Sequence, residues 1–381
     1  MKRHITDLRP DWKKTVEGQG MLFHTFDGDI YWDESAYYEF DAAEINAIEA
    51  ASYELNDRCL EAVQHVIDNN LFDAFLIPPE FHQFIRDSWE HDEHTIYGRF
   101  DFSYDGKTQP KMLEYNADTP TGLIEAAVTQ WYWAKDKFPT RNQFNSIHER
   151  LIEVWKELKA VTPGVLYFTA LAGNLEDYMN VNYLRDTAIQ AGWETEYIDI
   201  ENIGWNEGRR TFTDLNENPI QTCFKLYPWE WMQTDEFGKK LFLKTSKWLE
   251  APWKALLSNK AILPVLWELF PDHPNLLEAS FQPLRTKPYV QKPILSREGA
   301  NVQIFEHGEL LLKTDGPYDG PCVYQHLWEL PNFDGNHACI GSWMVNGWAC
   351  GIGIREDKTL VTGNMSRFVP HIFGVRPKYG N

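Results

Sequence analysis

Apolar positions with a helical period define three segments in the first third of the chain. Residues 40–70 carry a long amphipathic pattern, and Asp41 at its start is a preferred N-cap residue. Residues 77–92 begin with a pair of prolines, which a first helical turn tolerates. Residues 122–134 continue the helical pattern. We predict a helix in each segment.

Between these helices, the pattern changes to a period of two. Residues 95–106 (TIYGRFDFSYDG) alternate in strand fashion and end in Asp105-Gly106, a dipeptide typical of hairpin turns. Residues 110–118 (PKMLEYNAD) follow directly. We therefore predict an antiparallel β-hairpin in which the second strand returns along the first.

An α/β unit is predicted in the middle of the chain. Residues 164–171 form a short apolar run typical of a buried strand, residues 172–180 are expected to be a loop, and a helix reaches Gly192. Residues 194–203 then form the next strand, which gives a strand–helix–strand unit of ordinary length. Residues 221–232 are expected to be a further strand and turn.

The last third of the chain is predicted to be rich in β-structure. Residues 259–279 are expected to be helical in two pieces. After Pro288 the strand patterns follow one another closely, at residues 289–295, 301–306, 322–330, 338–357 and 360–364. The predicted fold class is α+β with an internal α/β unit.

Length and charge narrow the class of protein. The chain has 381 residues, enough for two or three packed subdomains. Its formal net charge of −20 argues against a nucleic-acid or anionic-membrane partner, because both bind basic surfaces. An acidic surface would tolerate a cationic substrate such as a polyamine. The 16 Trp, 17 Tyr and 22 Phe are explained by a large aromatic core more simply than by an aromatic binding strip.

Cysteine usage and hydropathy bear on location. The five cysteines show no metal-binding spacing, so we expect free, mostly buried thiols in a reducing compartment. The first residues (MKRHITDLRPDWKK) lack the apolar core of a secretory signal, and no apolar run has the length of a membrane span. These features predict a cytoplasmic protein.

The predicted hairpin places four polar side chains on one face. Residues two apart in a strand point the same way, so Arg99 and Asp101 project together, as do Glu114 and Asn116. Carboxylate and amide oxygens suit Mg²⁺, and an adjacent arginine would neutralise a transferred phosphoryl group. By spacing alone, a solvated hairpin face with a salt bridge explains these residues slightly better.

A second group of residues suits phosphate binding. Lys292 ends an apolar strand and precedes a loop with Ser296, Arg297, Gly299 and Asn301. Glycine lets backbone N–H groups surround a phosphate, and lysine supplies a point charge. Lys260, at the start of an apolar helix, is either a second phosphate ligand or a lysine that reaches solvent. A mobile hairpin tip explains the loop equally well, and an ordinary core strand explains residues 322–330.

The order of these motifs resembles one family. The chain contains R-F-D at 99–101, L-E-Y-N-A-D-T-P-T at 113–121, N-K-A-I-L-P-V-L-W at 259–267, K-P-x-x-x-R-x-G-x-N-V from Lys292, and V-Y-Q-x-L-W at 323–328. It resembles the synthetase domain of glutathionylspermidine synthase and related stand-alone acid–amine ligase-like proteins, over nearly the whole chain.

This resemblance implies an ATP-grasp fold with an α/β (pre-ATP-grasp-like) subdomain. The whole of 1–381 would form one synthetase module. Within it, roughly 125–235 would be the substrate subdomain, and 250–381 would hold the lid and nucleotide-binding part. The implied reaction is activation of a carboxylate by ATP to an acyl phosphate, followed by attack of an amine to form an amide. The acid would be a small molecule or short, glutathione-like peptide, the amine would be a polyamine or similar, and Mg²⁺ would be required.

The resemblance also implies roles for individual residues. The catalytic residues would be Arg99, which would stabilise the acyl phosphate, and Arg355. The metal ligands would be Asp101, Glu114 and Asn116. The nucleotide-binding residues would be Arg99, Asp101, Lys260, Lys292, Gly299 and the adenine hinge Gln325, His326, Leu327 and Trp328. The substrate residues would be Thr119, Thr121, Glu176 and Asp177.

Some features leave the substrates and the class open. Thr119 and Thr121 fall where the family has two serines, so the hydroxyls are kept but the acid is not identified. Glu176 and Asp177 are equally explained as acidic residues at a helix N-terminus. One alternative is a nucleotide-binding protein of the same fold without ligase activity, either an ATPase or a regulatory partner. Another is an aromatic-rich saccharide- or peptide-binding protein. Arg99 beside metal-type ligands favours the ligase.

Overall fold

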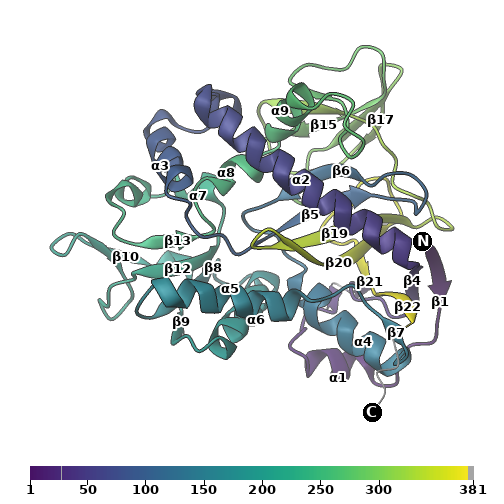
Figure 1. The fold of residues 1–381 in the computed structure, drawn as a ribbon, viewed down its shortest axis with the longest axis horizontal. Helices are drawn as coiled ribbons and strands as arrows, with labels where there is room; N and C mark the ends of the chain where they lie inside the picture. Colours follow the sequence, from purple (N-terminus) through teal and green to yellow (C-terminus); the bar gives the residue numbers. More distant parts are fainter. Residues whose placement is uncertain (27, 376–381) are drawn as a thin grey trace.

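The computed structural model describes residues 1–26 and 28–375, and it is a mixed α+β structure (Figure 1). The long helix α2 (Ala42–Asp68) crosses in front of the central strands. Asp41 caps it: the Asp41 carboxylate accepts from the backbone N–H of Glu44, and the Glu44 side chain accepts from the backbone N–H of Asp41. The sequence prediction of this helix is confirmed.

The other helices are mostly short. They are α1 (Trp12–Glu17), α3 (Pro79–Glu90), α4 (Gln130–Lys137), α5 (Ile147–Val161), α6 (Leu175–Gln190), α7 (Trp229–Met232), α8 (Lys254–Leu257) and α9 (Ile262–Leu269), with 3₁₀ turns η1 (Phe72–Phe75), η3 (Ile200–Asn202) and η4 (Gly238–Leu243). A π-helix, η2 (Glu125–Thr129), directly precedes α4.

The central sheet has the strand order β21-β20-β19-β5-β6 and is antiparallel. Its strands are β5 (Tyr97–Ser103), β6 (Lys111–Asn116), β19 (His337–Val345), β20 (Trp348–Asp357) and β21 (Arg367–Val369). The predicted hairpin is confirmed as β5 and β6. In its register Arg99 lies opposite Asn116 and Asp101 opposite Glu114, so the four polar side chains share one face.

Three further sheets surround the central one. One, here called the β15 sheet, has β14 (Ala279–Ser280), β18 (Cys322–His326), β15 (Tyr289–Pro293), β16 (Gln303–Glu306) and β17 (Glu309–Lys313) in that order. A parallel sheet has β13 (Lys247–Leu249), β12 (Thr222–Leu226), β8 (Leu166–Ala170) and β9 (Thr195–Tyr197). A terminal sheet has β1 (Lys2–Ile5), β4 (Ala36–Phe40), β22 (His371–Val375) and β7 (Arg141–Asn142). Small ribbons pair β2 (Thr25–Phe26) with β3 (Asp29–Ile30), and β10 (Gly204–Asn206) with β11 (Thr211–Thr213).

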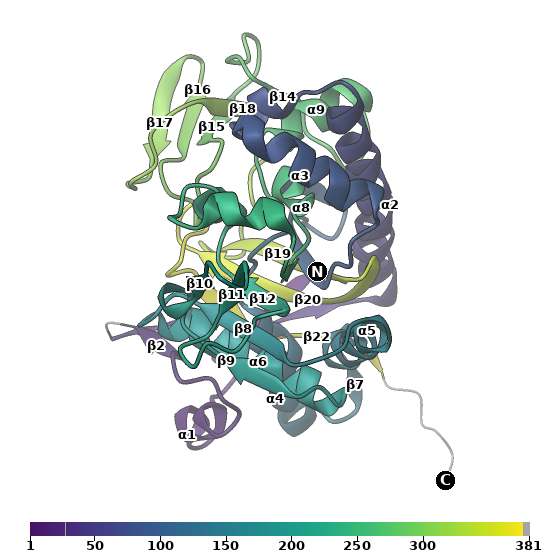
Figure 2. The same cartoon turned by 90° about the vertical axis from the view of Figure 1, so that its left-hand side faces the viewer.

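Figure 2 shows the β15 sheet and the parallel sheet on either side of β19 and β20. In the parallel sheet, β8, α6 and β9 form the predicted strand–helix–strand unit. Strands β8 and β12 are buried along their whole length, as expected for a parallel sheet. Their carboxyl ends, near Leu171 and Leu226, reach the cavity where the candidate site lies, which is the usual ligand position for such sheets.

Several predicted boundaries were wrong. Residues 172–180 are not all loop, because α6 begins at Leu175, where Asn174 caps it. The strand predicted at 194–203 ends at Tyr197 and gives way to η3. The second helical piece before residue 279 is absent, because prolines 271 and 274 interrupt the chain after α9. Residues 360–364 form turns and coil rather than a strand, and residues 327–330 lie beyond the end of β18.

Other elements had no counterpart in the prediction. These include α5 and the terminal sheet, whose strands come from distant parts of the sequence. The five cysteines are free, and four of them are buried, as expected. No helix in the described part of the chain is long and apolar enough to cross a membrane.

Candidate active site

A buried carboxylate between two arginines lies at the centre of the site. Arg99 donates to Asp101 through Nε (2.6 Å) and Nη2 (3.0 Å), and Arg355 on β20 donates to the same carboxylate at 2.7 Å. Asp101 is only 2% exposed. Strand β19 lies between β5 and β20, and Gly341 leaves room for Arg99, since a Cβ there would lie 2.7 Å from its Cδ. The sheet therefore brings two guanidinium groups together over one carboxylate.

Glu114 and Asn116 continue this polar group along β6. The Asn116 amide nitrogen donates to Glu114 (3.1 Å) and to Asp101 (3.3 Å). Burial alone would raise the pKa of Glu114, but the positive charges of Lys260 and Lys292 outweigh it and hold that pKa well below its usual range. Glu114 is therefore an anion at neutral pH.

Two lysines reach this face from other elements. The Lys260 ammonium lies 3.3 Å from a Glu114 oxygen. Lys292, on β15, donates to Gln325 Oε1 at 2.7 Å and to the Leu113 carbonyl at 3.0 Å. Burial, together with the charge of Lys260, lowers the pKa of Lys292 to about 8 despite the neighbouring Glu114. These cations are held close to one another, which favours a polyanionic ligand.

An apolar cavity of about 90 Å³ lies between the β15 sheet and the central sheet. Asp101, Glu114, Lys260, Lys292 and Gly299 form its polar end. Its apolar walls include Val290, Val302, Ile304, Leu327, Trp328, Leu330 and Val361. The cavity thus combines apolar walls with a charged end that carries two lysines and two carboxylates.

A polar cavity of about 170 Å³ lies on the other side of Glu114. The predicted residues on its walls are Arg99, Glu114, Asn116, Thr119, Thr121, Glu176, Asp177, Gly299 and Arg355. Glu114 and Gly299 border both cavities, so the two meet at the β5–β6 face. One cavity suits a flat ligand with an anionic group, and the other suits ligands with charges of both signs.

The acidic pair of the polar cavity lies in the first turn of α6. Burial and the charge of Glu176 raise the pKa of Asp177 to about 7, and burial also raises the pKa of Glu176. Both residues lie at a helix N-terminus and also on the cavity wall, so the two sequence interpretations of this pair are compatible.

A family model described as glutathionylspermidine synthase preATP-grasp matches residues 3–374. The chain belongs to the glutathionylspermidine synthase family. A Haemophilus influenzae protein described as a candidate acid–amine ligase is 42% identical, over 96% of this chain and 97% of its own length.

Larger relatives match over part of their length. The trypanothione synthetase of Crithidia fasciculata is 31% identical, over 87% of this chain and 56% of its own length. The bifunctional glutathionylspermidine synthetase/amidase of Escherichia coli is 29% identical, over 90% of this chain and 60% of its own length. Among solved structures, a glutathione synthetase-like effector from Globodera pallida shares the fold, with a TM-score of 0.57 over 96% of both chains at 9% identity.

The adenine hinge predicted from the glutathionylspermidine synthase pattern, residues 325–328, is only partly brought together at the site. Leu327 and Trp328 line the apolar cavity, but Gln325 and His326 do not. The Gln325 side chain is buried between strands, where it holds Lys292 and donates to the Met112 carbonyl at 3.2 Å. Its link to the cavity is Lys292, which lines the cavity wall.

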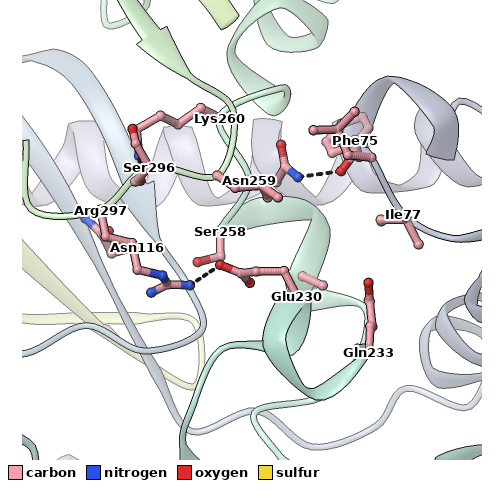
Figure 3. Close-up of a pocket in the computed structure, with 13 residues that line it drawn as sticks. Phe75, Ile77, Asn116, Glu230, Gln233, Ser258, Asn259, Lys260, Ser296 and Arg297 are labelled. Carbon is pink, nitrogen blue, oxygen red and sulfur yellow. Dashed lines mark hydrogen bonds and ion pairs between the residues drawn. The ribbon is translucent and has the colours of Figure 1, made fainter. Parts of the chain in front are cut away.

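The sequence indicates no role for Arg297 beyond its place in the loop after Lys292, and it singles out neither Glu230 nor Tyr31. Arg297 bridges the site: it donates to Thr119 Oγ1 and to Glu230, each at 2.6 Å. Figure 3 shows this pair beside Asn116, Ser258 and Lys260 in a third, smaller cavity. Glu230 lies between two tryptophans in the short helix α7 that follows β12. A carboxylate so soon after a buried strand could have marked it in the sequence. Tyr31, also on the polar cavity, lies in an irregular segment that carries no period.

Proposed function

We propose that this protein is an ATP-dependent acid–amine ligase that forms an amide through an acyl phosphate. The observation that supports this most is the boundary between the two cavities, where Glu114 and Gly299 border both, with Arg99 on the wall of the polar cavity and Asp101 on the wall of the lysine-lined apolar cavity. Transfer of a phosphoryl group from a nucleotide to a carboxylate needs such a boundary, because both reactants must meet at one point.

The fold assignment is extended in the same way. We assign an ATP-grasp architecture, in which residues of roughly 125–235 form the substrate subdomain and residues 250–381 the lid and nucleotide-binding part. The position of the apolar cavity between the β15 sheet and the central sheet supports this division. Within it, the nucleotide base would contact Leu327 and Trp328, while Lys260 and Lys292 would contact phosphates near Gly299.

Magnesium ligation fits part of the predicted set. Within residues 1–26 and 28–375, no cluster of three or more His, Cys, Asp and Glu side chains could hold a metal by itself. Mg²⁺ commonly uses one or two carboxylates together with substrate phosphates, and Glu114 with Asn116 would supply that share. Asp101 is already engaged by two arginines, so we assign it chiefly to positioning them. When bound, the ion would supply charge neutralisation at the phosphates.

The two arginines would act on the transferred group. Arg99 and Arg355 converge on Asp101 from different strands, which fixes their guanidinium groups before substrate arrives. Charge on the phosphoryl oxygens would then meet a preorganised cationic surface, which lowers the barrier without reorganisation.

The polar cavity would hold the acid and the amine. Its arginines suit the carboxylate of a small or peptide acid, with Thr119 and Thr121 as hydroxyl partners, and Glu176 and Asp177 suit a cationic amine. The relative named for glutathionylspermidine points to a glutathione-like acid and a polyamine as the first pair to test.

ADP release would test the proposal directly. The protein is incubated with Mg²⁺-ATP alone, with glutathione, and with glutathione plus a panel of polyamines, and products are identified by mass spectrometry. An amide mass formed in step with ADP supports the ligase. ADP release without an amide under all conditions would instead indicate the ATPase alternative, and no ATP binding would refute both.

A further inference from the structure

A buried acid behind the polar cavity has no structural explanation. The Tyr31 side chain lines the polar cavity, and its hydroxyl donates to Glu125 Oε1 at 2.9 Å. Glu125 is 0% exposed. Its other oxygen, Oε2, is buried and has no hydrogen-bond partner within residues 1–26 and 28–375. Glu125 Oε1 is therefore linked to the cavity through the Tyr31 hydroxyl, and Oε2 has no hydrogen-bond partner among the described residues.

The free-energy cost of burying Glu125 with one oxygen unpartnered indicates a functional role for this residue. A buried polar group without a partner is destabilising, and a buried carboxylate more so. A glutamine would accept the same bond from Tyr31 without carrying a charge. Glu125 also begins the π-helix η2, and π-helical turns are rare and frequent at functional sites. The chain thus keeps an ionisable group where a neutral one would serve packing better.

We propose that Tyr31 and Glu125 form the path by which the attacking amine loses its proton. This inference rests on the proposed ligase function and adds to it a residue pair for the second half-reaction. Glu125 is a positioned proton acceptor that acts through Tyr31, and Tyr31 is the group that faces the amine.

The chemistry balances in two proton transfers. The substrate ammonium gives one proton to the Tyr31 oxygen, while the Tyr31 hydroxyl proton passes to Glu125 Oε1, so the tyrosine ends neutral and the glutamate becomes a carboxylic acid. The amine lone pair then forms the C–N bond at the acyl carbon, and the C–O bond to phosphate breaks with its electron pair. The second nitrogen proton leaves on the phosphate, and Glu125 returns its proton to water after product release.

The surroundings of Glu125 give a proton acceptor that titrates slightly above neutral pH. Burial, and next the negative charge of Glu176, raise the pKa of Glu125 to about 8, while Tyr31 and the positive charge of Arg99 act in the opposite sense. Burial, and next the charge of Glu125, raise the pKa of Tyr31 well above its usual value, while the positive charge of Arg355 acts in the opposite sense. Glu125 is protonated below about pH 8 and accepts protons above it, so amide formation should rise through that pH.

The test compares pH profiles of variants with two amines. Amide formation from glutathione is measured with spermidine, which arrives as a cation, and with hydroxylamine, which is uncharged at neutral pH. The variants are Glu125→Gln and Tyr31→Phe. Tyr183→Phe is the matched control. Tyr183 is about as buried as Tyr31 but lies outside the cavity, and its hydroxyl is 3.0 Å from the His148 ring nitrogen.

With spermidine, we expect both site variants to lose about 10²-fold or more in kcat, as is typical for loss of general-base catalysis. The rise near pH 8 should disappear, while KM for ATP stays the same. With hydroxylamine both should stay within a few-fold of the wild type, as Tyr183→Phe should with either amine. If Glu125→Gln does not fold, Tyr31→Phe decides the result.

An unchanged pH profile in the site variants, or an equal loss with both amines, would overturn the proton path and leave the ligase intact. A wild-type protein that makes no amide would overturn the ligase and this inference together.

Discussion

Arg99 shows how one side chain connects the parts of the site. Its guanidinium holds Asp101, donates to the Thr121 carbonyl and lies 5.7 Å from the centre of the Trp343 ring. It is 8% exposed, so its position is fixed by these contacts. The apolar cavity does not include Arg99, whereas the polar cavity does. For the proposed ligase, we therefore assign Arg99 to the acyl phosphate more than to the nucleotide.

Replacing Arg99 by alanine should abolish ligation and leave nucleotide binding nearly intact. An arginine that stabilises phosphoryl transfer contributes about 10³-fold or more to the rate. The measurement is amide formation at saturating ATP, beside ATP affinity by calorimetry. Arg150→Ala, which removes a surface arginine paired with Glu153, is the control. Weaker ATP binding with full turnover at saturation would contradict the assignment.

At the scale of elements, the loop after β15 is fitted closely to its neighbours. Gly299 has φ of +68°, and a Cβ there would lie 2.5 Å from the Thr362 carbonyl oxygen. The loop thus packs against residues 360–364, and both segments line the two cavities. We interpret it as the lid over the nucleotide and the acyl phosphate, where it would exclude water.

In Gly299→Ala, the added methyl group should push the loop after β15 away from residues 360–364. We expect ADP formation at low ATP to fall about tenfold, which corresponds to about 1.4 kcal/mol, with little change in the free energy of unfolding. Gly308→Ala is a close control, because Gly308 also has a positive φ, of +84°, but no atom lies within 4 Å of its Cβ position. Equal effects of the two variants on ADP formation would mean that backbone strain, and not the contact with Thr362, is responsible.

The sequence predicted elements whose partners lie nearby in the chain. The hairpin of β5 and β6 was recognised because alternation and a short connection determine both strands and their pairing. The lysines were found by their position at the ends of apolar segments. The residue order alone did not show that Arg99 and Arg355 meet at Asp101, because β19 and β20 join that sheet from more than 200 residues away.

Residues in irregular segments had no periodic signal. Tyr31 and Asn364 line the polar cavity from loops, and the apolar residues 360–361 looked like a strand but cover a cavity instead. Glu125 lay inside a segment correctly predicted as helical, yet its burial depends on tertiary packing that a helical period does not specify. Terminal strand pairing was missed for the same reason.

At the scale of the whole molecule, a buried ion pair joins the parallel sheet to the loop after β6. The Lys225 ammonium lies 2.6 Å from Asp118, and both side chains are fully buried. Asp118 also accepts from the Trp229 backbone N–H at 2.9 Å. Removing one partner would leave an uncompensated charge in the interior.

Asp118→Ala should therefore lower the free energy of unfolding by about 3–5 kcal/mol, measured by urea denaturation. The double variant Asp118→Leu with Lys225→Leu should lose less, since no buried charge remains. Glu207→Ala removes an exposed partner of Lys240 and should change stability by about 0–1 kcal/mol. A double variant as unstable as the single one would show that the pair serves packing rather than charge compensation.

The place of β22 has a consequence for how the chain is made. This strand, at residues 371–375, lies between β4 and β7, which are synthesised more than two hundred residues earlier. Until it emerges from the ribosome, both earlier strands have unpaired edges that invite association with other chains. Cotranslational folding of this sheet must wait until residues 371–375 have been made, so we expect the nascent chain to depend on chaperones until that point.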